Sequence, residues 1–153
     1  MSENFQSDIN IKNKKANFEY ELLEKFEAGL QISGTEIKSI RLGKVSIAES
    51  YCAFKNEELF VFNMDISPYE KASFANHEPK RKRKLLLHKK ELLKLLKKKK
   101  DVGLTIIPTR LFINDKGFAK LNIALAKGKK LYDKRESLKS KDVKKQIDRL
   151  LKQ

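Results

Sequence analysis

Five consecutive basic residues near the middle of the chain carry the clearest chemistry in the sequence: Lys80, Arg81, Lys82, Arg83 and Lys84. They lie in a predicted loop and lead into a leucine triplet that must anchor to the core, so we expect the charges to be held at a fixed place on the surface. Phosphates spaced along a nucleic acid suit such an array, because each neutralised phosphate releases a counterion and arginine adds a planar fork for bidentate contact. A solvated lysine-rich face or a localisation-type tract is the alternative interpretation.

The charge of the whole chain points the same way. The 153 residues carry a net charge of +15, yet residues 1–79 hold nine basic against thirteen acidic side chains. The excess lies in residues 80–100, with twelve basic against one acidic, and in residues 127–153, with eleven against four. Two concentrated basic segments attract a polyanion, either a nucleic acid or a membrane surface. No apolar stretch is long enough to span a bilayer and the N-terminus has no signal-peptide pattern, so we expect a cytoplasmic protein without a membrane partner.

The residues that usually perform catalysis or bind metals are sparse. The sequence has one cysteine, Cys52, and two histidines, His77 and His88, with no carboxylate or cysteine at ligand spacing around them. Cys52 stands among strand-forming residues and is expected to be a small buried hydrophobe. No glycine loop suited to phosphate and no nucleophile with a nearby base is present. We therefore expect neither an enzyme nor a cofactor or metal site.

Apolar periodicity predicts a mainly β domain with inserted helices. Residues 20–32 are apolar at even positions, with Glu24 the exception, and polar at most odd ones, which predicts a long half-buried strand. Thr35 is placed to cap a short helix and Gly43 to end it. Two strands are expected in residues 50–54 and 59–66, a long loop in residues 67–84, and an amphipathic helix in residues 85–100.

A hairpin follows, with strands in residues 104–113 and 118–126. Gly117 supplies the positive φ of the turn, and Pro108 places its strand at an edge or a bulge. Five or six mostly antiparallel strands with two or three helices fit a small barrel of the oligonucleotide-binding type.

Residues 128–153, the C-terminal tail, have another pattern. They open with "GKKLYDKRE", and Val143, Ile147, Leu150 and Leu151 then follow at i, i+4, i+7 and i+8. Such a short lysine-rich amphipathic helix is marginal in water, so we expect the tail to be disordered in the free protein until something covers its apolar side. A terminal helix docked on the domain is the alternative.

Four segments together resemble the SmpB family, the SsrA-binding proteins of bacterial trans-translation: "FEAGLQISGTEIKSIRLG", "NMDISPYE", "HEPKRKRKLLLHKKEL" and "GKKLYDKRE". The resemblance implies a variable leader in residues 1–12, an oligonucleotide-binding-type antiparallel β-barrel in residues 13–127, and a tail that is helical on the ribosome. It implies two partners. These are the tRNA-like end of transfer-messenger RNA, bound by the barrel, and a stalled ribosome, whose decoding centre and empty message channel receive the tail.

The resemblance also implies which residues meet RNA. On the barrel, the residues that match the family's segments, together with the basic run, are Asn13, Lys14, Lys15, Glu27, Thr35, Glu36, Lys38, Ser39, Arg41, Lys80, Arg81, Arg83, Lys84, Leu86 and His88. In the tail they are Gly128, Lys129, Lys130, Tyr132, Asp133, Lys134 and Arg135, followed by the helix through Val143, Ile147 and Leu150.

Three of these residues have ordinary structural alternatives. Glu27 falls on the polar face of its strand and could be a plain exposed carboxylate, Leu86 could belong to the core, and His88 could start a helix facing solvent. If it meets RNA, Glu27 must accept from a base edge or a 2′-hydroxyl, or orient a neighbouring cation, because phosphate repels a carboxylate.

The expected function is a non-enzymatic RNA-binding adaptor, monomeric when free, that delivers transfer-messenger RNA to stalled ribosomes. A structural ribosomal protein with a basic tail is the alternative, and composition does not separate the two. Their stoichiometry on ribosomes would.

Overall fold

The computed structural model describes residues 8–72, 75–101 and 103–129 of the chain. The elements follow one another as β1 (Asn10–Lys12), α1 (Lys14–Glu19), β2 (Tyr20–Leu30), α2 (Gly34–Arg41), β3 (Val45–Ser46), β4 (Tyr51–Lys55), β5 (Glu58–Phe62), β6 (Asp65–Ile66), β7 (Arg83–Leu86), α3 (Lys89–Lys98), β8 (Leu104–Ile113) and β9 (Ala119–Gly128). The protein is thus mainly β with three helices in its described part, as the sequence predicted. Within these described residues, no helix combines the length and apolar character needed to cross a membrane.

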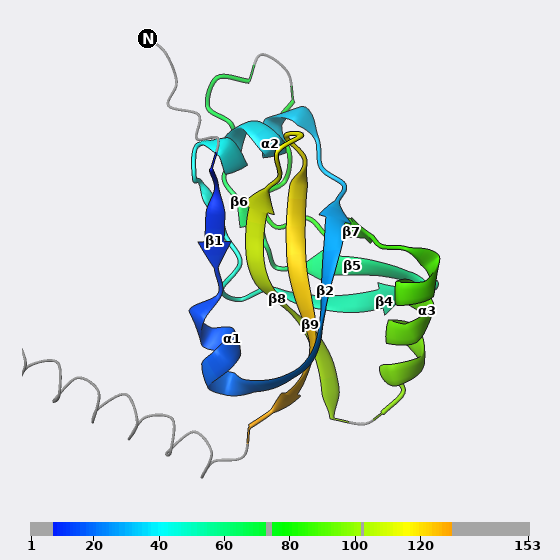
Figure 1. Ribbon diagram of the computed structural model, residues 1–153. Helices are drawn as coiled ribbons and strands as arrows, with labels where there is room; N and C mark the ends of the chain where they lie inside the picture. The colour runs from blue at the N-terminus through cyan, green and yellow to red at the C-terminus, as the bar shows by residue number, and fades with distance from the viewer. Residues whose placement is uncertain (1–7, 73–74, 102, 130–153) are drawn as a thin grey trace, which may run out of the picture.

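Seven strands form one antiparallel sheet in the order β1-β8-β4-β5-β7-β2-β9, and β3 pairs separately with β6. Because β8 also pairs with β9, the pairings return to β8 and make a closed cycle of six strands. In Figure 1, β2, β8 and β9 run side by side in front, while β4 and β5 cross behind them. Helix α2 lies over one end of the sheet, above the β8–β9 turn, and α3 stands beside the β4–β5 layer.

One hydrophobic core lies between these two layers. Along β2, Phe26, Ala28 and Leu30 are buried while Lys25 and Glu27 are exposed, so the predicted alternation is confirmed. The inward side chains of the front layer join those of the rear layer in a single cluster, which also receives Ile40 from α2 and Leu95 from α3. The outward faces of the two layers therefore lie on opposite sides of the molecule.

Both hairpin turns follow from local backbone chemistry. Gly117 has a φ of 85° in the β8–β9 turn and Gly43, which follows α2, has a φ of 75°, as predicted for both positions. The β4–β5 turn uses Asn56 and Glu57 at φ values of 50° and 66°, the arrangement that matches strand twist in a two-residue hairpin.

Several boundaries differ from the sequence predictions. The sheet begins at Asn10, before the expected domain start at residue 13. The short helix α1 was not predicted, because six residues are too few to show an apolar periodicity. The N-cap of α2 is Ser33 rather than Thr35, with the Ser33 N–H donating to Glu36 Oε1 at 2.9 Å. Residues 83–86 form strand β7 and not the start of a helix, because they pair with β2 and β5.

A buried ion pair joins α2 to β7. The side chains of Glu36 and Arg83 are both 0% exposed and form a salt bridge through Arg83 Nε and Glu36 Oε2. Arg83 also donates to the carbonyl oxygens of Met64 at 2.7 Å and Pro79 at 3.1 Å, and Arg81 donates to Glu36 Oε1 at 2.5 Å. One guanidinium thus holds a helix, the link between β5 and β6 and the long loop before β7 to one another.

These contacts set the protonation of the carboxylate. Burial alone would raise the pKa of Glu36, but hydrogen bonds from Arg81, the Ser33 backbone and Arg83 outweigh it and lower this pKa to about 2. A depressed carboxyl pKa stabilises the fold above the unfolded-state value, and this stabilisation is lost as the pH falls toward the folded-state pKa.

The ion pair predicts an acid-labile fold. Glu36→Gln leaves the buried Arg83 without its counter-charge, so we expect a loss of about 3–5 kcal/mol in the free energy of unfolding at pH 7. The variant should also lose less stability than the wild type between about pH 4.5 and pH 2. Urea unfolding across this pH range measures both effects.

Glu49→Gln is the control, because Glu49 forms an exposed pair with Lys15. It should change the free energy of unfolding at pH 7 much less than Glu36→Gln does, because solvent screens an exposed pair. Equal losses from the two substitutions would contradict the role assigned to Glu36.

Candidate nucleic-acid interface

A β-bulge in β8 shapes the outward face of the front layer. The register with β9 shifts between Pro108 and Arg110, as the proline predicted, so that Pro108 faces Ile123 and Arg110 faces Asn122. Without the extra residue, Arg110 would share the inward side of Ile106. The bulge therefore turns a guanidinium outward.

Asn13 holds this bulge in place. Its backbone N–H donates to the Thr109 carbonyl at 2.8 Å, and its side-chain Nδ2 donates to the Pro108 carbonyl at 3.0 Å. The residue is 9% exposed, and these two bonds give it a positioning role, while its contact with RNA stays a prediction. It satisfies carbonyls that the bulge leaves without ladder partners.

The strand register assembles a polar row across four strands. Lys12 of β1 faces Arg110 of β8, Arg110 faces Asn122 of β9, and Asn122 faces Glu27 of β2. These residues line a groove of about 480 Å³ between α1 and the sheet. Its full lining is Lys12, Asn13, Lys14, Asn17, Lys25, Phe26, Glu27, Thr109, Arg110 and Asn122. We call this surface the polar groove.

Arg110 is held ready within the polar groove. Its Nε donates to Asn10 Oδ1 at 2.5 Å, and its guanidinium lies 4.2 Å from the ring centroid of Phe112. A guanidinium fixed in this way loses little further freedom when it binds a phosphate or a base edge. The four cations Lys12, Lys14, Lys25 and Arg110 surround the single carboxylate of the groove, that of exposed Glu27, whose contact with RNA stays a prediction.

Lys15 points to another side of α1. Its Nζ lies 2.5 Å from Glu49 Oε1, and both side chains are exposed. The structure therefore separates it from Lys14 and from the polar groove.

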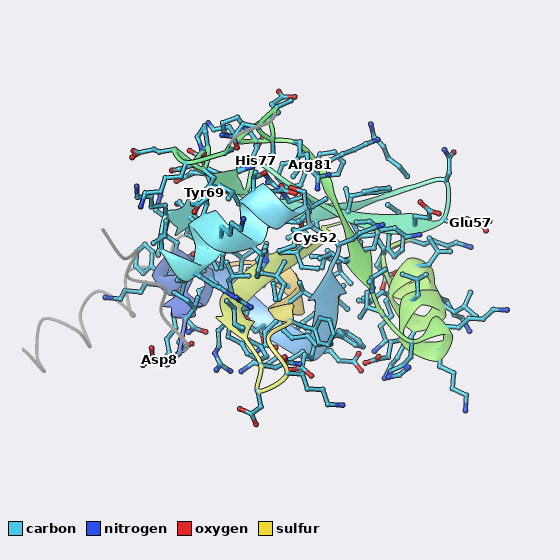
Figure 2. The ribbon with its side chains drawn as sticks, turned by 90° about the horizontal axis from the view of Figure 1, so that it is seen from above. Asp8, Cys52, Glu57, Tyr69, His77 and Arg81 are labelled. Carbon is cyan, nitrogen blue, oxygen red and sulfur yellow. The ribbon has the colours of Figure 1, made fainter. Side chains whose placement is uncertain are left out.

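Some of the α2 residues that are expected to contact RNA reach the surface and others are buried. Lys38 is exposed, with its Nζ 5.3 Å from the ring centroid of Tyr69, and half-buried Arg41 donates to the Gly117 carbonyl at 3.4 Å. The Thr35 hydroxyl is 2.9 Å from His77 Nδ1, while His77 Nε2 is 2.9 Å from the Ile66 carbonyl. Figure 2, seen from above, shows Tyr69, His77 and Arg81 close along α2.

Ser39 and Glu36 are both 0% exposed, so the RNA contacts expected of them are corrected to structural roles. Both side chains lie on the side of α2 that faces the core.

The basic run is not one continuous array. Arg83 is fully buried against Glu36, and Arg81 is bound to the same carboxylate, so two of the five charges are already paired inside the protein. Lys80 and Lys82 are exposed, and half-buried Lys84 lies 3.2 Å from Glu58. The prediction of five surface charges is therefore wrong for Arg83. Side chains alternate along a strand, and Arg83 occupies an inward position of β7.

Leu86 and His88 lie on the surface. Leu86 is 51% exposed and faces Gly29 of β2, where a Cβ would come within 3.3 Å of the leucine Cβ. The glycine thus lets Leu86 lie close over β2. Glu27 precedes Gly29 by two residues and His88 follows Leu86 by two, so the antiparallel register brings both to one end of this pair. Leu86 is therefore not a core leucine, and exposed His88 is the N-cap residue of α3.

Sequence reasoning missed six polar lining residues of the polar groove: Lys12, Asn17, Lys25, Thr109, Arg110 and Asn122. The alternation of β9 contained a signal for Asn122, since Leu121 and Ile123 face inward. Arg110 gave no such signal, because its direction depends on the bulge.

The tail predictions fall mostly outside the described residues, including those on Lys130, Tyr132, Asp133, Lys134, Arg135, Val143, Ile147 and Leu150. Gly128 ends β9. The backbone N–H of Lys129 donates to the Glu19 carbonyl at 3.0 Å and its Nζ to the Asn17 carbonyl at 2.8 Å, so Lys129 still contacts the domain.

The cysteine is buried, as expected, and burial raises the pKa of its thiol. In the described part of the chain, no three His, Cys, Asp or Glu side chains are grouped to hold a metal ion.

Comparison with known proteins places this architecture in one family. A model of the SmpB protein family matches residues 10–153. An SsrA-binding protein of Cytophaga hutchinsonii is 62% identical over 143 residues, covering 94% of each chain. One from Christiangramia forsetii is 57% identical over 148 residues, covering 97% of this chain and 94% of the relative.

A solved structure described as "tmRNA-SmpB: a journey to the center of the bacterial ribosome" is similar in fold, with a TM-score of 0.69 and 46% sequence identity. The match covers 85% of this chain and 94% of that one. On the match of nearly the whole sequence, the protein described here belongs to the SmpB family.

Proposed function

We propose that this protein is a non-enzymatic adaptor that binds the tRNA-like end of transfer-messenger RNA and delivers it to stalled ribosomes. Relatives in the SmpB family carry the name SsrA-binding protein, and the solved structure of similar fold concerns tmRNA, SmpB and the ribosome. The closed cycle of antiparallel pairings supports a barrel of the oligonucleotide-binding type.

The polar groove is the observation that carries the proposal. It gathers Lys12, Lys14, Lys25 and Arg110 from four elements around Glu27 and Asn122. The cations suit the phosphates of a folded RNA, while the carboxylate and the amide suit base edges and 2′-hydroxyls. Leu86, exposed beside β2, offers an apolar contact for an unstacked base at the edge of the same outward face.

The C-terminal tail supplies the second half of the proposed function. Its basic segment and its amphipathic pattern, with Val143, Ile147 and Leu150 on one side, suit ribosomal RNA near the decoding centre and in the message channel. In this proposal the domain recognises the transfer-messenger RNA and the tail recognises the vacant channel.

Two variants of the polar groove test charge and geometry separately. Lys12→Gln combined with Lys14→Gln removes two exposed cations, so the slope of log affinity against log salt should fall by about 0.7–0.9 for each phosphate that is no longer neutralised. Arg110→Lys keeps the charge and removes the planar fork, so the slope should stay while affinity falls about tenfold. Fluorescence anisotropy with the tRNA-like fragment measures both quantities.

The matched control removes two lysines elsewhere, by Lys97→Gln on α3 and Lys116→Gln in the β8–β9 turn; both residues are exposed. Its effect on the salt slope should be smaller than that of the groove variant. Equal effects would mean that the RNA responds to net charge alone, and the assignment of the polar groove would fail.

Removal of residues 130–153 should separate RNA binding from rescue. The described domain closes by Gly128 and Lys129, so the shortened protein should fold and bind the tRNA-like fragment with only a few-fold loss from removed charge. Tagging of peptides on truncated messages in a reconstituted translation reaction should be lost. Retained tagging would contradict the role of the tail, and an unfolded product would show that the tail is part of the domain.

A further inference from the structure

Three aromatic rings lie on the outward face of the rear layer. In β5, Leu59 and Val61 point into the core, so Phe60 and Phe62 point outward, and in β4 buried Cys52 leaves Tyr51 outward. Two lysines accompany the rings. We call this surface, made of Tyr51, Phe60, Phe62, Lys55 and Lys82, the aromatic face.

The rings and the lysines of the aromatic face are in contact. Tyr51 and Phe62 stack with centroids 5.4 Å apart and an interplanar angle of 15°. Lys55 Nζ lies 5.6 Å from the centroid of Phe62, and Lys82 Nζ lies 5.0 Å from that of Phe60. Flat π-surfaces beside ammonium groups are the pairing that single-stranded nucleic acids use, since bases stack on rings and phosphates pair with cations.

The charge of this face favours a polyanion. Glu58 is the carboxylate within the three strands β4, β5 and β7 of this layer. It is the register partner of Lys55 and forms a salt bridge of 3.2 Å with Lys84. Glu57 lies in the turn beyond the strands, and Figure 2 shows it at the outer tip of the β4–β5 hairpin. Lys55 and Lys82 therefore remain as surface cations beside the rings.

The aromatic face is separate from the polar groove. The inward side chains of both layers meet in one core cluster, so the outward faces of β4–β5 and of β8–β9 lie on opposite sides of the protein. An RNA element seated in the polar groove leaves the aromatic face uncovered. Tyr51 is 43% exposed and Phe60 and Phe62 are partly exposed, so a ligand can reach the rings.

We propose that the aromatic face binds unpaired RNA nucleotides, with bases stacking on Tyr51 and Phe60 and phosphates pairing with Lys55 and Lys82. The two lysines that now cover the rings move aside to the phosphates when bases arrive. This site adds a second RNA contact and does not rest on the function assigned to the polar groove.

The test uses the full chain and an unstructured uridine oligomer in fluorescence anisotropy, beside the tRNA-like fragment. Tyr51→Leu with Phe60→Leu keeps apolar volume and removes the rings. We expect affinity for the uridine oligomer to fall about tenfold or more, because bases no longer stack on either ring, while affinity for the tRNA-like fragment changes less than about twofold.

A second pair of variants guards against a folding defect. Lys55→Gln with Lys82→Gln alters only exposed side chains and should reduce the salt slope of uridine-oligomer binding, whereas Lys97→Gln with Lys100→Gln on and just after α3 should not. The proposal is overturned if the wild-type protein does not bind the oligomer, if the ring variant binds it as tightly as the wild type, or if both lysine pairs act alike. Loss of tRNA-like binding in the groove variants alone would leave this proposal standing.

Discussion

The contact between Glu36 and Arg83 constrains most of the structure. Two charges removed from water are costly unless they meet each other and further partners, and here the guanidinium is shared among Glu36 and the carbonyls of Met64 and Pro79. These partners come from α2, from the link between β5 and β6 and from the long loop before β7. The pair therefore fixes where β7 enters the sheet, and with it the outward positions of Lys84 and Leu86.

The register of the sheet then places potential RNA-binding side chains on two outward faces of the protein. On the front layer, the β8 bulge and Asn13 turn Arg110 into a groove that already holds lysines, an amide and a carboxylate. On the rear layer, simple alternation brings aromatic rings and lysines to the surface. Both faces surround one closed cycle of strands, which gives the two proposed kinds of RNA contact a rigid support.

Local patterns predicted the parts of the fold that local chemistry decides. The alternation of β2, the glycine turns at Gly43 and Gly117 and the hairpin of β8 with β9 could be read directly, because each depends on neighbouring residues. The inward direction of the Arg83 side chain could not be predicted, since a cation in a basic run is expected to be exposed. Its burial is explained by its partner Glu36, which lies 47 positions away in the sequence. Arg110 was missed for a similar reason: a one-residue bulge reverses the face on which it lies.

The central claim is that the polar groove, and not the basic run as a whole, receives the tRNA-like RNA. Brief lysine acetylation followed by mass spectrometry, with and without the tRNA-like fragment, tests it without amino-acid substitutions. The account predicts that the RNA slows acetylation of Lys12, Lys14 and Lys25 strongly, while Lys82, Lys97 and Lys116 react at nearly the same rate in both samples. Unchanged reactivity of the three groove lysines, with protection concentrated at Lys80 and Lys82, would contradict it.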